Sequence, residues 1–363
     1  MLHSIMAKEA RQAPAVLRAE SARWQEQALA IRKLTATRRT AVLVGRGSSG
    51  NVCTYAAYLL ALQSGRQAIE FRPWLATQSL PQADWDDAVV YAFSYSGRST
   101  DIAASAEWLR ARGAIVVAVT EAGSPDAELL KTAQHVIRLG CGPELAVPAT
   151  KSVVAQLFIA AALAGYDITA AAQQTAQCME RIDAAGAPAQ LATFLAGART
   201  VTWLARGPSI GGALDAALKM QESVGIPAFG YSSAEYLHGP IAAASADDRV
   251  VLFSGAYERP QPWLGQAPRG GARKLGSGPA FPHEPQGSQQ AVTAALLARG
   301  VPSLCLGDER AAEAQLPLPL PDALWARTAV LAYVAQLACA TLAERQGISP
   351  DEHPSLRKVT QTR

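Results

Sequence analysis

The sequence predicts an α/β protein made of two tandem units, each a parallel β-sheet between two layers of helices. Two observations lead to this expectation. Short apolar runs alternate with helical spacing, as where 88–93 is followed by 102–112, and such alternation is typical of parallel sheets covered on both faces. An apolar run followed by Arg-Gly and a helix also occurs twice, at Arg46-Gly47 and at Arg206-Gly207. The recurrence indicates a duplicated unit, with chance repetition of a common turn as the alternative.

The spacing of apolar residues predicts each element in turn, beginning with a helical segment of mixed charge at residues 1–37. We expect strands at 41–44, 88–93, 114–120, 135–139, 200–205 and 301–306, and helices at 49–62, 102–112, 151–164, 211–224, 290–298 and from about 321. The first domain should then span 38–168 and the second 198–345, with a C-terminal tail at 346–363. Residues 257–289 are crowded with Gly and Pro, and we assign them no element and no function.

Composition excludes several classes of function. The net charge is +3 over 363 residues and no Lys/Arg block is present, which argues against a nucleic-acid partner. The five cysteines contain no CxxC pair, so we expect a reducing compartment and neither a disulfide framework nor a zinc site. The N-terminus lacks the apolar core of a signal peptide, and the most apolar segment, Ala329–Ala343, is shorter than a membrane span of about 20 residues. We therefore expect a cytoplasmic protein without a membrane partner.

Two hydroxyl-rich turns at the ends of predicted strands are the best candidates for a ligand site. They are Gly47-Ser48-Ser49 and Ser94-Tyr95-Ser96-Gly97-Arg98-Ser99. Small hydroxyls and free N–H groups at a helix N-terminus suit a phosphate group, and open α/β sheets bind ligands at the carboxyl ends of their strands. Neither turn has the dinucleotide-binding glycine pattern. N-capping is the ordinary alternative for each turn, but two such turns at neighbouring strand ends favour a site.

Three titratable residues of the second unit could carry acid–base chemistry. Lys219 and Glu222 are three positions apart on a predicted helix and therefore share one face, although a surface ion pair is the commoner fate of such residues. His238 stands directly before Gly239-Pro240, where the chain must turn, and it titrates near neutrality. Taken alone, a structural histidine is the better interpretation. The polar residues 351–360 would by themselves indicate a frayed tail.

Together these motifs resemble the sugar isomerase (SIS) family, in particular the paired SIS domains of the isomerase half of glucosamine-6-phosphate synthase and the stand-alone deaminases of that family. The resemblance covers nearly the whole chain from about residue 38. It rests on six segments in the family's order: 45–49, 94–99, 149–152, 218–222, 233–240 and 358–360.

The resemblance implies a role for each matching residue. Ser49, Ser94, Ser96 and Ser99 would hold a sugar phosphate, helped by Ser48 and the backbone at Tyr95, while Val147 and Ala149 would line the sugar. Glu222 would move a proton between C1 and C2, with Lys219 stabilising the developing enediol charge. His238 would open the sugar ring from the neighbouring subunit of a homodimer, and Lys358 would close over the substrate from the tail. This chemistry needs no metal and no cofactor.

The function that the resemblance implies is that of a glucosamine-6-phosphate deaminase, which forms fructose 6-phosphate and ammonia. A deglycase or ketose/aldose isomerase for another phosphosugar is the alternative among enzymes. A non-catalytic sugar-phosphate sensor is the other alternative, although such a protein could lose Glu222, Lys219, His238 or Lys358, all present here. Synthase activity is not expected, because residues 1–37 leave no room for a glutaminase domain.

Overall fold

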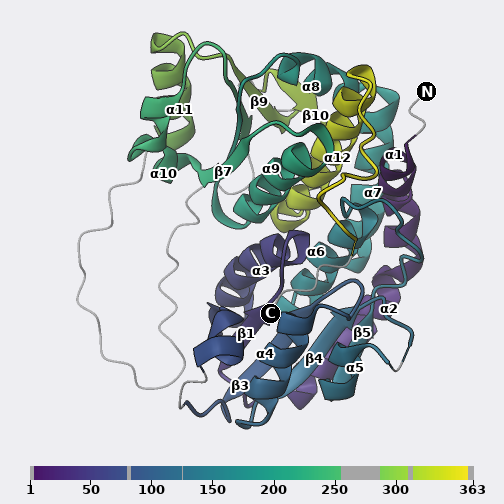
Figure 1. Ribbon diagram of the computed structural model, residues 1–363. Helices are drawn as coiled ribbons and strands as arrows, with labels where there is room; N and C mark the ends of the chain where they lie inside the picture. Colours follow the sequence, from purple (N-terminus) through teal and green to yellow (C-terminus); the bar gives the residue numbers. More distant parts are fainter. Residues whose placement is uncertain (1–3, 80–82, 125, 255–286, 310–313, 359–363) are drawn as a thin grey trace.

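The computed structural model describes residues 4–79, 83–124, 126–254, 287–309 and 314–358. It contains two five-stranded sheets in which every strand pairing is parallel (Figure 1). The strands are β1 (Thr40–Val44), β2 (Gln67–Glu70), β3 (Ala88–Phe93), β4 (Ile115–Thr120), β5 (His135–Arg138), β6 (Val201–Ala205), β7 (Ala228–Ser232), β8 (Arg249–Phe253), β9 (Ser303–Asp308) and β10 (Leu316–Leu318). The first sheet has the order β2-β1-β3-β4-β5 and the second the equivalent order β7-β6-β8-β9-β10. The shared order confirms the predicted duplication.

Helices cover both sheets. They are α1 (Ile5–Ala10), α2 (Ala13–Leu34), α3 (Ser48–Leu59), α4 (Thr100–Arg110), α5 (Glu128–Thr132), α6 (Lys151–Ala164), α7 (Thr169–Ala184), α8 (Ala187–Leu195), α9 (Ile210–Val224), α10 (Ser233–Leu237), α11 (Gly287–Ala298) and α12 (Arg327–Arg345). Short turns of π-helix, η1 (Leu60–Ser64) and η2 (Leu75–Ser79), and of 3-10 helix, η3 (Gly207–Ser209), η4 (Pro240–Ala243) and η5 (Leu324–Ala326), connect them.

The strands are apolar on both faces because each face packs against helices. In β3, Tyr91 belongs to the core cluster that also contains residues of α2, α3 and α6, while Val90 belongs to a separate cluster with α4. In the second sheet, Val251 faces α9 and α12, and Leu252 packs with residues of α11. Each unit is therefore a three-layer sandwich, as the alternation of strands and helices predicted.

The two units share one continuous core where α3 and α6 of the first meet α9 and α12 of the second (Figure 1). Gly211, near the start of α9, shows how closely these helices approach. A Cβ atom placed on Gly211 would lie 2.6 Å from the carbonyl oxygen of Asn51 and 2.9 Å from the Cβ of Tyr55, both on α3. Only glycine permits this approach, which fixes the two domains against each other.

Several expectations about elements are corrected. The N-terminal segment is two helices, broken at Arg11-Gln12, and Pro14 lies in the first turn of α2, where its missing N–H costs nothing. We predicted no elements at β2, β7, β8, β10, α5, α7, α8 or α10. The Gly/Pro-rich stretch falls largely outside the described residues, and the helix after it begins at Gly287.

The membrane argument based on length was also wrong. Residues Leu324–Arg345 form a 22-residue helical segment that is long and apolar enough to cross a membrane. Its apolar window is completely buried inside the molecule, however, and α12 packs on α8 and α9 as a core helix. The expectation of a buried helix is therefore confirmed on different grounds.

Candidate active site

The two hydroxyl-rich turns lie side by side at the carboxyl ends of β1 and β3, which are adjacent strands of the first sheet. This is the position where the strand order reverses, and such switch points are where open α/β sheets bind ligands. Gly47 and Gly97 both adopt positive φ, +53° and +63°, which lets each turn curl tightly before its helix. The structure therefore brings the two predicted phosphate turns together.

The capping alternative does not account for the hydroxyls in these turns. Helix α3 has Gly47 as its N-cap, and Ser99, the N-cap of α4, makes no side-chain capping hydrogen bond. In the second turn the Ser94 hydroxyl accepts a hydrogen bond from the N–H of Gly97 at 3.2 Å, and the Ser96 hydroxyl accepts one from the N–H of Arg98 at 3.3 Å. Ser94 and Ser96 thus shape the turn, while Ser99 is left without a capping bond.

An ion pair that the sequence did not suggest joins the two turns. The Nε of Arg46, in the first turn, lies 2.6 Å from the Oδ2 of Asp101, which is buried at the start of α4. The side chain of Arg46 is itself 53% exposed. The ion pair ties the first turn to the start of α4, and the exposed part of the guanidinium offers N–H donors to an anion beside the N-termini of two helices.

A loop after β5, residues 140–150, closes one side of this region around a buried carboxylate, Glu144. One oxygen of Glu144 accepts hydrogen bonds from the N–H and the hydroxyl of Thr150, at 2.9 and 3.1 Å, and from the N–H of Ser152 at 3.1 Å. The other oxygen accepts from the Ser152 hydroxyl at 2.7 Å and from Nζ of Lys358 at 3.1 Å. Burial alone would raise the pKa of Glu144, but the Lys358 ammonium and these hydrogen bonds hold it below its ordinary value.

Tyr95 links this loop to the second turn. Its hydroxyl donates to the carbonyl of Gly142 at 3.0 Å and accepts from the N–H of Glu144 at 2.8 Å. Burial, together with the nearby charge of Glu144, raises the pKa of Tyr95, so the phenol keeps its proton. The side chain therefore fixes the 140–150 loop to the second turn, and the role of the Tyr95 backbone towards a phosphate stays a prediction.

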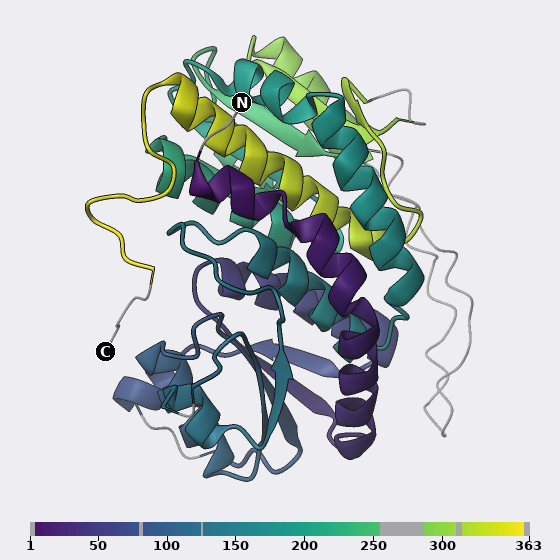
Figure 2. The same cartoon turned by 90° about the vertical axis from the view of Figure 1, so that its right-hand side faces the viewer.

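The C-terminal tail crosses from α12 to the first domain and ends beside the same loop (Figure 2). The N–H of Val147 donates to the carbonyl of Asp351 at 2.7 Å, and the Asp351 carboxylate accepts from the N–H groups of Ile5 and Met6. Lys358 also donates to the carbonyl of Ala146 at 2.6 Å, and its Nζ lies 5.3 Å from the centre of the Tyr95 ring. The described part of the tail is docked rather than frayed, and Lys358 contacts Ala146, which directly precedes the predicted sugar-lining residue Val147.

Lys219 and Glu222 form an ion pair inside the protein, so the surface-pair alternative is wrong. Nζ of Lys219 lies 2.5 Å from Oε2 of Glu222, the lysine side chain is wholly buried, and the glutamate side chain is 19% exposed. Burial would lower the pKa of Lys219, but the charges of Glu222 and Asp215 outweigh it and raise the pKa. The pair is a carboxylate that is partly exposed and held against a buried ammonium whose pKa is raised.

His238 is not brought to this pair. It follows α10, is exposed, and within the described part of the chain no hydrogen bond or ion pair joins its side chain to Glu222 or Lys219. Its position is compatible with the expectation that it serves a neighbouring subunit, which remains a prediction.

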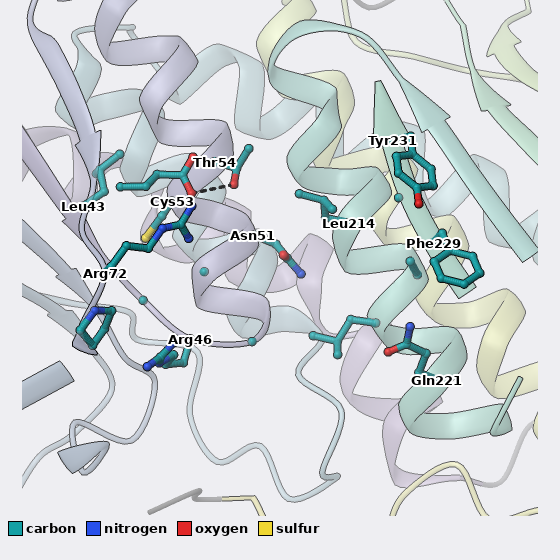
Figure 3. Close-up of a pocket in the computed structure, with 18 of the residues that line it drawn as sticks. Leu43, Arg46, Asn51, Cys53, Thr54, Arg72, Leu214, Gln221, Phe229 and Tyr231 are labelled. Carbon is teal, nitrogen blue, oxygen red and sulfur yellow. Dashed lines mark hydrogen bonds between the residues drawn. The ribbon is translucent and has the colours of Figure 1, made fainter. Parts of the chain in front are cut away.

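A cavity of about 530 Å³ lies beside the predicted site, between α3 and α9 (Figure 3). It is lined by Arg46 and Gly47 of the first turn, by Asn51 of α3, and by Leu218 and Gln221 of α9. None of the predicted site residues lines it, because Lys219 and Glu222 project from an adjacent face of α9. Among the described residues, no group of three or more His, Cys, Asp or Glu side chains could hold a metal ion.

Sequence reasoning missed three charged residues of this region: Arg46, Glu144 and Asp215. Arg46 was noted in the recurring Arg-Gly turn, but no role in the site was assigned to it. Glu144 and Asp215 are single acidic residues whose burial depends on segments far away in the sequence, so no local pattern marks them.

Comparisons with known proteins agree with this architecture. Residues 34–165 match the family model of the SIS domain. The chain is 33% identical over 182 residues to the glutamine–fructose-6-phosphate aminotransferase (isomerizing) of Caulobacter vibrioides, an alignment that covers 46% of this chain and 30% of that protein. The chain therefore spans less than a third of the length of this relative.

Solved structures share the whole fold. Glucosamine-6-phosphate deaminase from Thermotoga maritima superimposes with a TM-score of 0.72 at 18% identity, covering 98% of this chain and 100% of that one. Tagatose-6-phosphate ketose/aldose isomerase from Escherichia coli gives a TM-score of 0.78 at 16% identity, covering 98% and 97%. These likenesses show that both units share the fold of those proteins. Residues 34–165 are thus a SIS (sugar isomerase) domain, and the fold of the chain is that of two such domains in tandem.

Proposed function

We propose that this protein converts glucosamine 6-phosphate to fructose 6-phosphate and ammonia. The observation that carries the proposal is the buried Lys219–Glu222 pair, a carboxylate and an ammonium held 2.5 Å apart on α9, which packs against α3, the helix that begins in the first hydroxyl turn. An ion pair on the protein surface would leave both side chains in solvent, whereas here Lys219 is wholly buried and Glu222 is 19% exposed. The names of the relatives, a fructose-6-phosphate aminotransferase and a glucosamine-6-phosphate deaminase, support an amino-sugar phosphate as the substrate.

In this proposal the first domain holds the phosphate end of the sugar. Ser49, Ser94, Ser96 and Ser99, with Ser48 and the N–H groups near Tyr95, surround the phosphate at the N-termini of α3 and α4. Positive helix ends and hydroxyl donors bind a dianion without a metal ion. Val147 and Ala149 contact the sugar from the 140–150 loop, and Lys358 covers it from the tail.

The second domain supplies the proton transfer. In the ring-opened sugar, Glu222 removes the proton from C2, and the aldehyde oxygen takes a proton from the substrate's own 2-ammonium group, which gives a neutral enolamine. Lys219 stabilises the negative charge that develops on the oxygen. Glu222 then returns its proton to C1, which leaves a ketimine at C2 that water hydrolyses to a ketone and ammonia.

Ring opening requires an acid–base group that the Lys219–Glu222 pair does not supply. His238 is exposed on its own subunit, which suits a residue that acts on the site of a partner. We therefore propose a homodimer in which each subunit gives His238 to the other.

The direct test is incubation of the purified protein with glucosamine 6-phosphate while ammonia and fructose 6-phosphate are measured. Both products should form in equal amounts, and Glu222→Gln should reduce kcat by about 100-fold or more, the typical effect of general acid–base catalysis. Glu107→Gln, an exposed glutamate on α4, is the matched control and should keep native turnover.

Other products would point to other functions. Interconversion of aldose and ketose phosphates without ammonia would favour the isomerase alternative, and ammonia only from fructosamine 6-phosphate would favour a deglycase. Saturable binding of the sugar phosphates with no turnover on any of them would overturn the enzyme proposal in favour of a sensor.

A further inference from the structure

The middle of the 140–150 loop is held by groups that lie outside the loop. Every residue from 143 to 147 has a backbone N–H or carbonyl bonded in this way, and the partners are Lys151, Tyr95, Glu9, Lys358 and Asp351. The proposed reaction gives Tyr95 and Lys358 a place in the site but uses nothing from the N-terminal helices. The contacts of Glu9 therefore need an explanation of their own.

Glu9, on α1, binds two consecutive N–H groups at the centre of the loop. Its Oε1 accepts from the N–H of Leu145 at 2.5 Å, and its Oε2 accepts from the N–H of Ala146 at 3.2 Å. The residue is 5% exposed, so these bonds are shielded from water. Because peptide units are planar, a carboxylate that holds two successive N–H groups fixes the direction in which the chain continues to Val147 and Ala149.

The break between α1 and α2 serves the same loop. Gln12 is the N-cap of α2 but makes no side-chain capping bond there. Its amide oxygen instead accepts from Nζ of Lys151 at 2.6 Å, and the same ammonium donates to the carbonyl of Pro143 at 2.7 Å. Lys151 is 3% exposed at the start of α6. The N-terminal segment thus reaches the loop directly through Glu9 and indirectly through Lys151.

Asp351 connects α1 to the tail beside the same loop. Its carboxylate accepts from the N–H of Ile5 at 2.9 Å and from the N–H of Met6 at 2.7 Å, while its carbonyl accepts from the N–H of Val147. Helix α1, the tail and the loop therefore form one hydrogen-bonded unit, and a shift of one part would disturb the other two.

Stability alone does not favour a carboxylate at the position of Glu9. Burial raises the pKa of Glu9, and the charge of Glu144 adds to the rise, while the two N–H groups and Lys358 oppose it. A raised pKa means that folding makes the ionised form less favourable. Acids with perturbed pKa values gather at functional sites, which directs attention to the loop that Glu9 holds.

We propose that Glu9 is a positioning residue for the sugar: from α1 it sets the backbone of residues 145–147 and so places Val147 and Ala149 against the substrate. The inference rests on the proposed function, in which the hydroxyl turns hold the phosphate and this loop contacts the sugar. Among the described residues, no hydrogen bond joins α1 to either turn, so separate parts of the first domain carry the two tasks. Loss of the Glu9 contacts should weaken binding of the sugar and spare binding of the phosphate.

The first test measures binding by titration calorimetry, with fructose 6-phosphate and inorganic phosphate as ligands. In Glu9→Gln the amide oxygen can accept from one of the two N–H groups, but the NH2 group faces the other, so the loop loses one bond to a charged group. The dissociation constant of fructose 6-phosphate should rise about tenfold, the size of one such bond, whereas that of inorganic phosphate should change by less than about twofold. Glu26→Gln, at an exposed glutamate on α2, is the matched control and should leave both constants unchanged.

The second test needs no ligand and follows amide hydrogen exchange in the free protein. The N–H of Val147 is bonded to Asp351 and not to Glu9, yet in Glu9→Gln it should exchange about tenfold faster, because a loosened loop separates from the tail. The amides of the 94–99 turn should keep their native rates. If Glu9→Gln does not fold, Asp351→Asn takes its place, because it releases the tail from α1 at a half-buried site and should separate the two ligands in the same way.

Equal weakening of both ligands would reduce Glu9 to a general stabilising contact and overturn the proposal. Unchanged affinity for fructose 6-phosphate, or an unmoved exchange rate at Val147, would do the same, and either result can occur in an active enzyme without touching the proposed function. If the native protein binds fructose 6-phosphate with the expected dependence on Glu9 but turns over no sugar phosphate, the proposed function fails and the role of Glu9 stands.

Discussion

Replacing Glu144 by Gln should destabilise the protein and release the tail, far more than removing its partner Lys358. Glu144 is fully buried and accepts five hydrogen bonds, three through one oxygen and two through the other. The amide oxygen of Gln can keep the three bonds from Thr150 and Ser152. Its NH2 group, however, would face the ammonium of Lys358 and the hydroxyl of Ser152, both of them donors in the native protein.

The expected loss follows from these contacts. Glu144→Gln removes two charge-assisted hydrogen bonds, those from Ser152 and Lys358, and each contributes about 1.5–3 kcal/mol. The Lys358 side chain is 24% exposed, so its share is discounted for solvent screening, and the free energy of unfolding should fall by about 2–4 kcal/mol. Lys358→Met removes one of these two bonds and leaves Glu144 its four bonds to Thr150 and Ser152, so it should cost about 1–1.5 kcal/mol after the same discount for the exposure of Lys358. The double variant should resemble Glu144→Gln.

Urea unfolding and limited proteolysis at residues 346–358 provide the assay. Glu128→Gln, which breaks an exposed ion pair with Lys131, is the control and should change stability by less than about 0.5 kcal/mol. Equal losses for Glu144→Gln and Lys358→Met, or unchanged cleavage of the tail in Glu144→Gln, would refute the reasoning.

The same contacts fix the sign of a pH effect. The pKa of Glu144 is lowered in the folded protein, so its carboxylate contributes stability above the unfolded pKa, and this contribution is lost as pH falls through the lower folded pKa. The difference in stability between wild type and Glu144→Gln should therefore be full near neutrality and shrink in acid. A difference that stays constant down to the acid limit of folding would contradict this account.

Two further changes test the geometry of the site. Gly211→Ala places a Cβ 2.6 Å from the carbonyl oxygen of Asn51, so it should cost about 1–3 kcal/mol in urea unfolding through overpacking. The control is Gly225→Ala at the end of α9, where a Cβ meets no atom within 4 Å; it should cost only its backbone strain and leave the α3–α9 contact intact. If both variants lower kcat/KM equally, the α3–α9 contact is not what positions the site. Ser99→Ala should change the free energy of unfolding by less than about 0.5 kcal/mol, because Ser99 makes no capping bond. It should nevertheless weaken the inhibition of turnover by inorganic phosphate. Unaltered inhibition would remove Ser99 from the proposed phosphate site.

The parts of this site that the sequence predicted are those set by local rules. A glycine with positive φ between an apolar run and a helix marks a turn wherever it occurs, so both hydroxyl turns were placed correctly from their own residues. The pair on α9 required only the spacing of three. The edge strands β2 and β7 escaped prediction because half of their residues are exposed or polar and their apolar runs are short.

Long-range pairing set the limit of prediction. Glu144 is 214 positions from Lys358, and nothing near either residue in the sequence indicates the other. Asp215 looks like any polar residue of an amphipathic helix until α3 covers it. Residues of this kind are identified only when the packing of the two domains is known, and they are the ones that control the charge of the site.

The duplication explains why these charges gather at the domain interface. The two Arg-Gly turns have kept nearly the same backbone, with φ of +53° at Gly47 and +54° at Gly207. Their serines have diverged, however: Ser49 is partly exposed, whereas Ser209 is completely buried and shares a hydrogen bond of 3.2 Å with Thr328 on α12. The Arg206-Gly207 turn has thus become part of the core, and it fixes the start of α9 against α12. A turn that is packed in this way cannot accept a phosphate, but it holds Asp215, Lys219 and Glu222 rigidly. In the proposed reaction one copy of the ancestral unit therefore anchors the substrate, and the other positions the base.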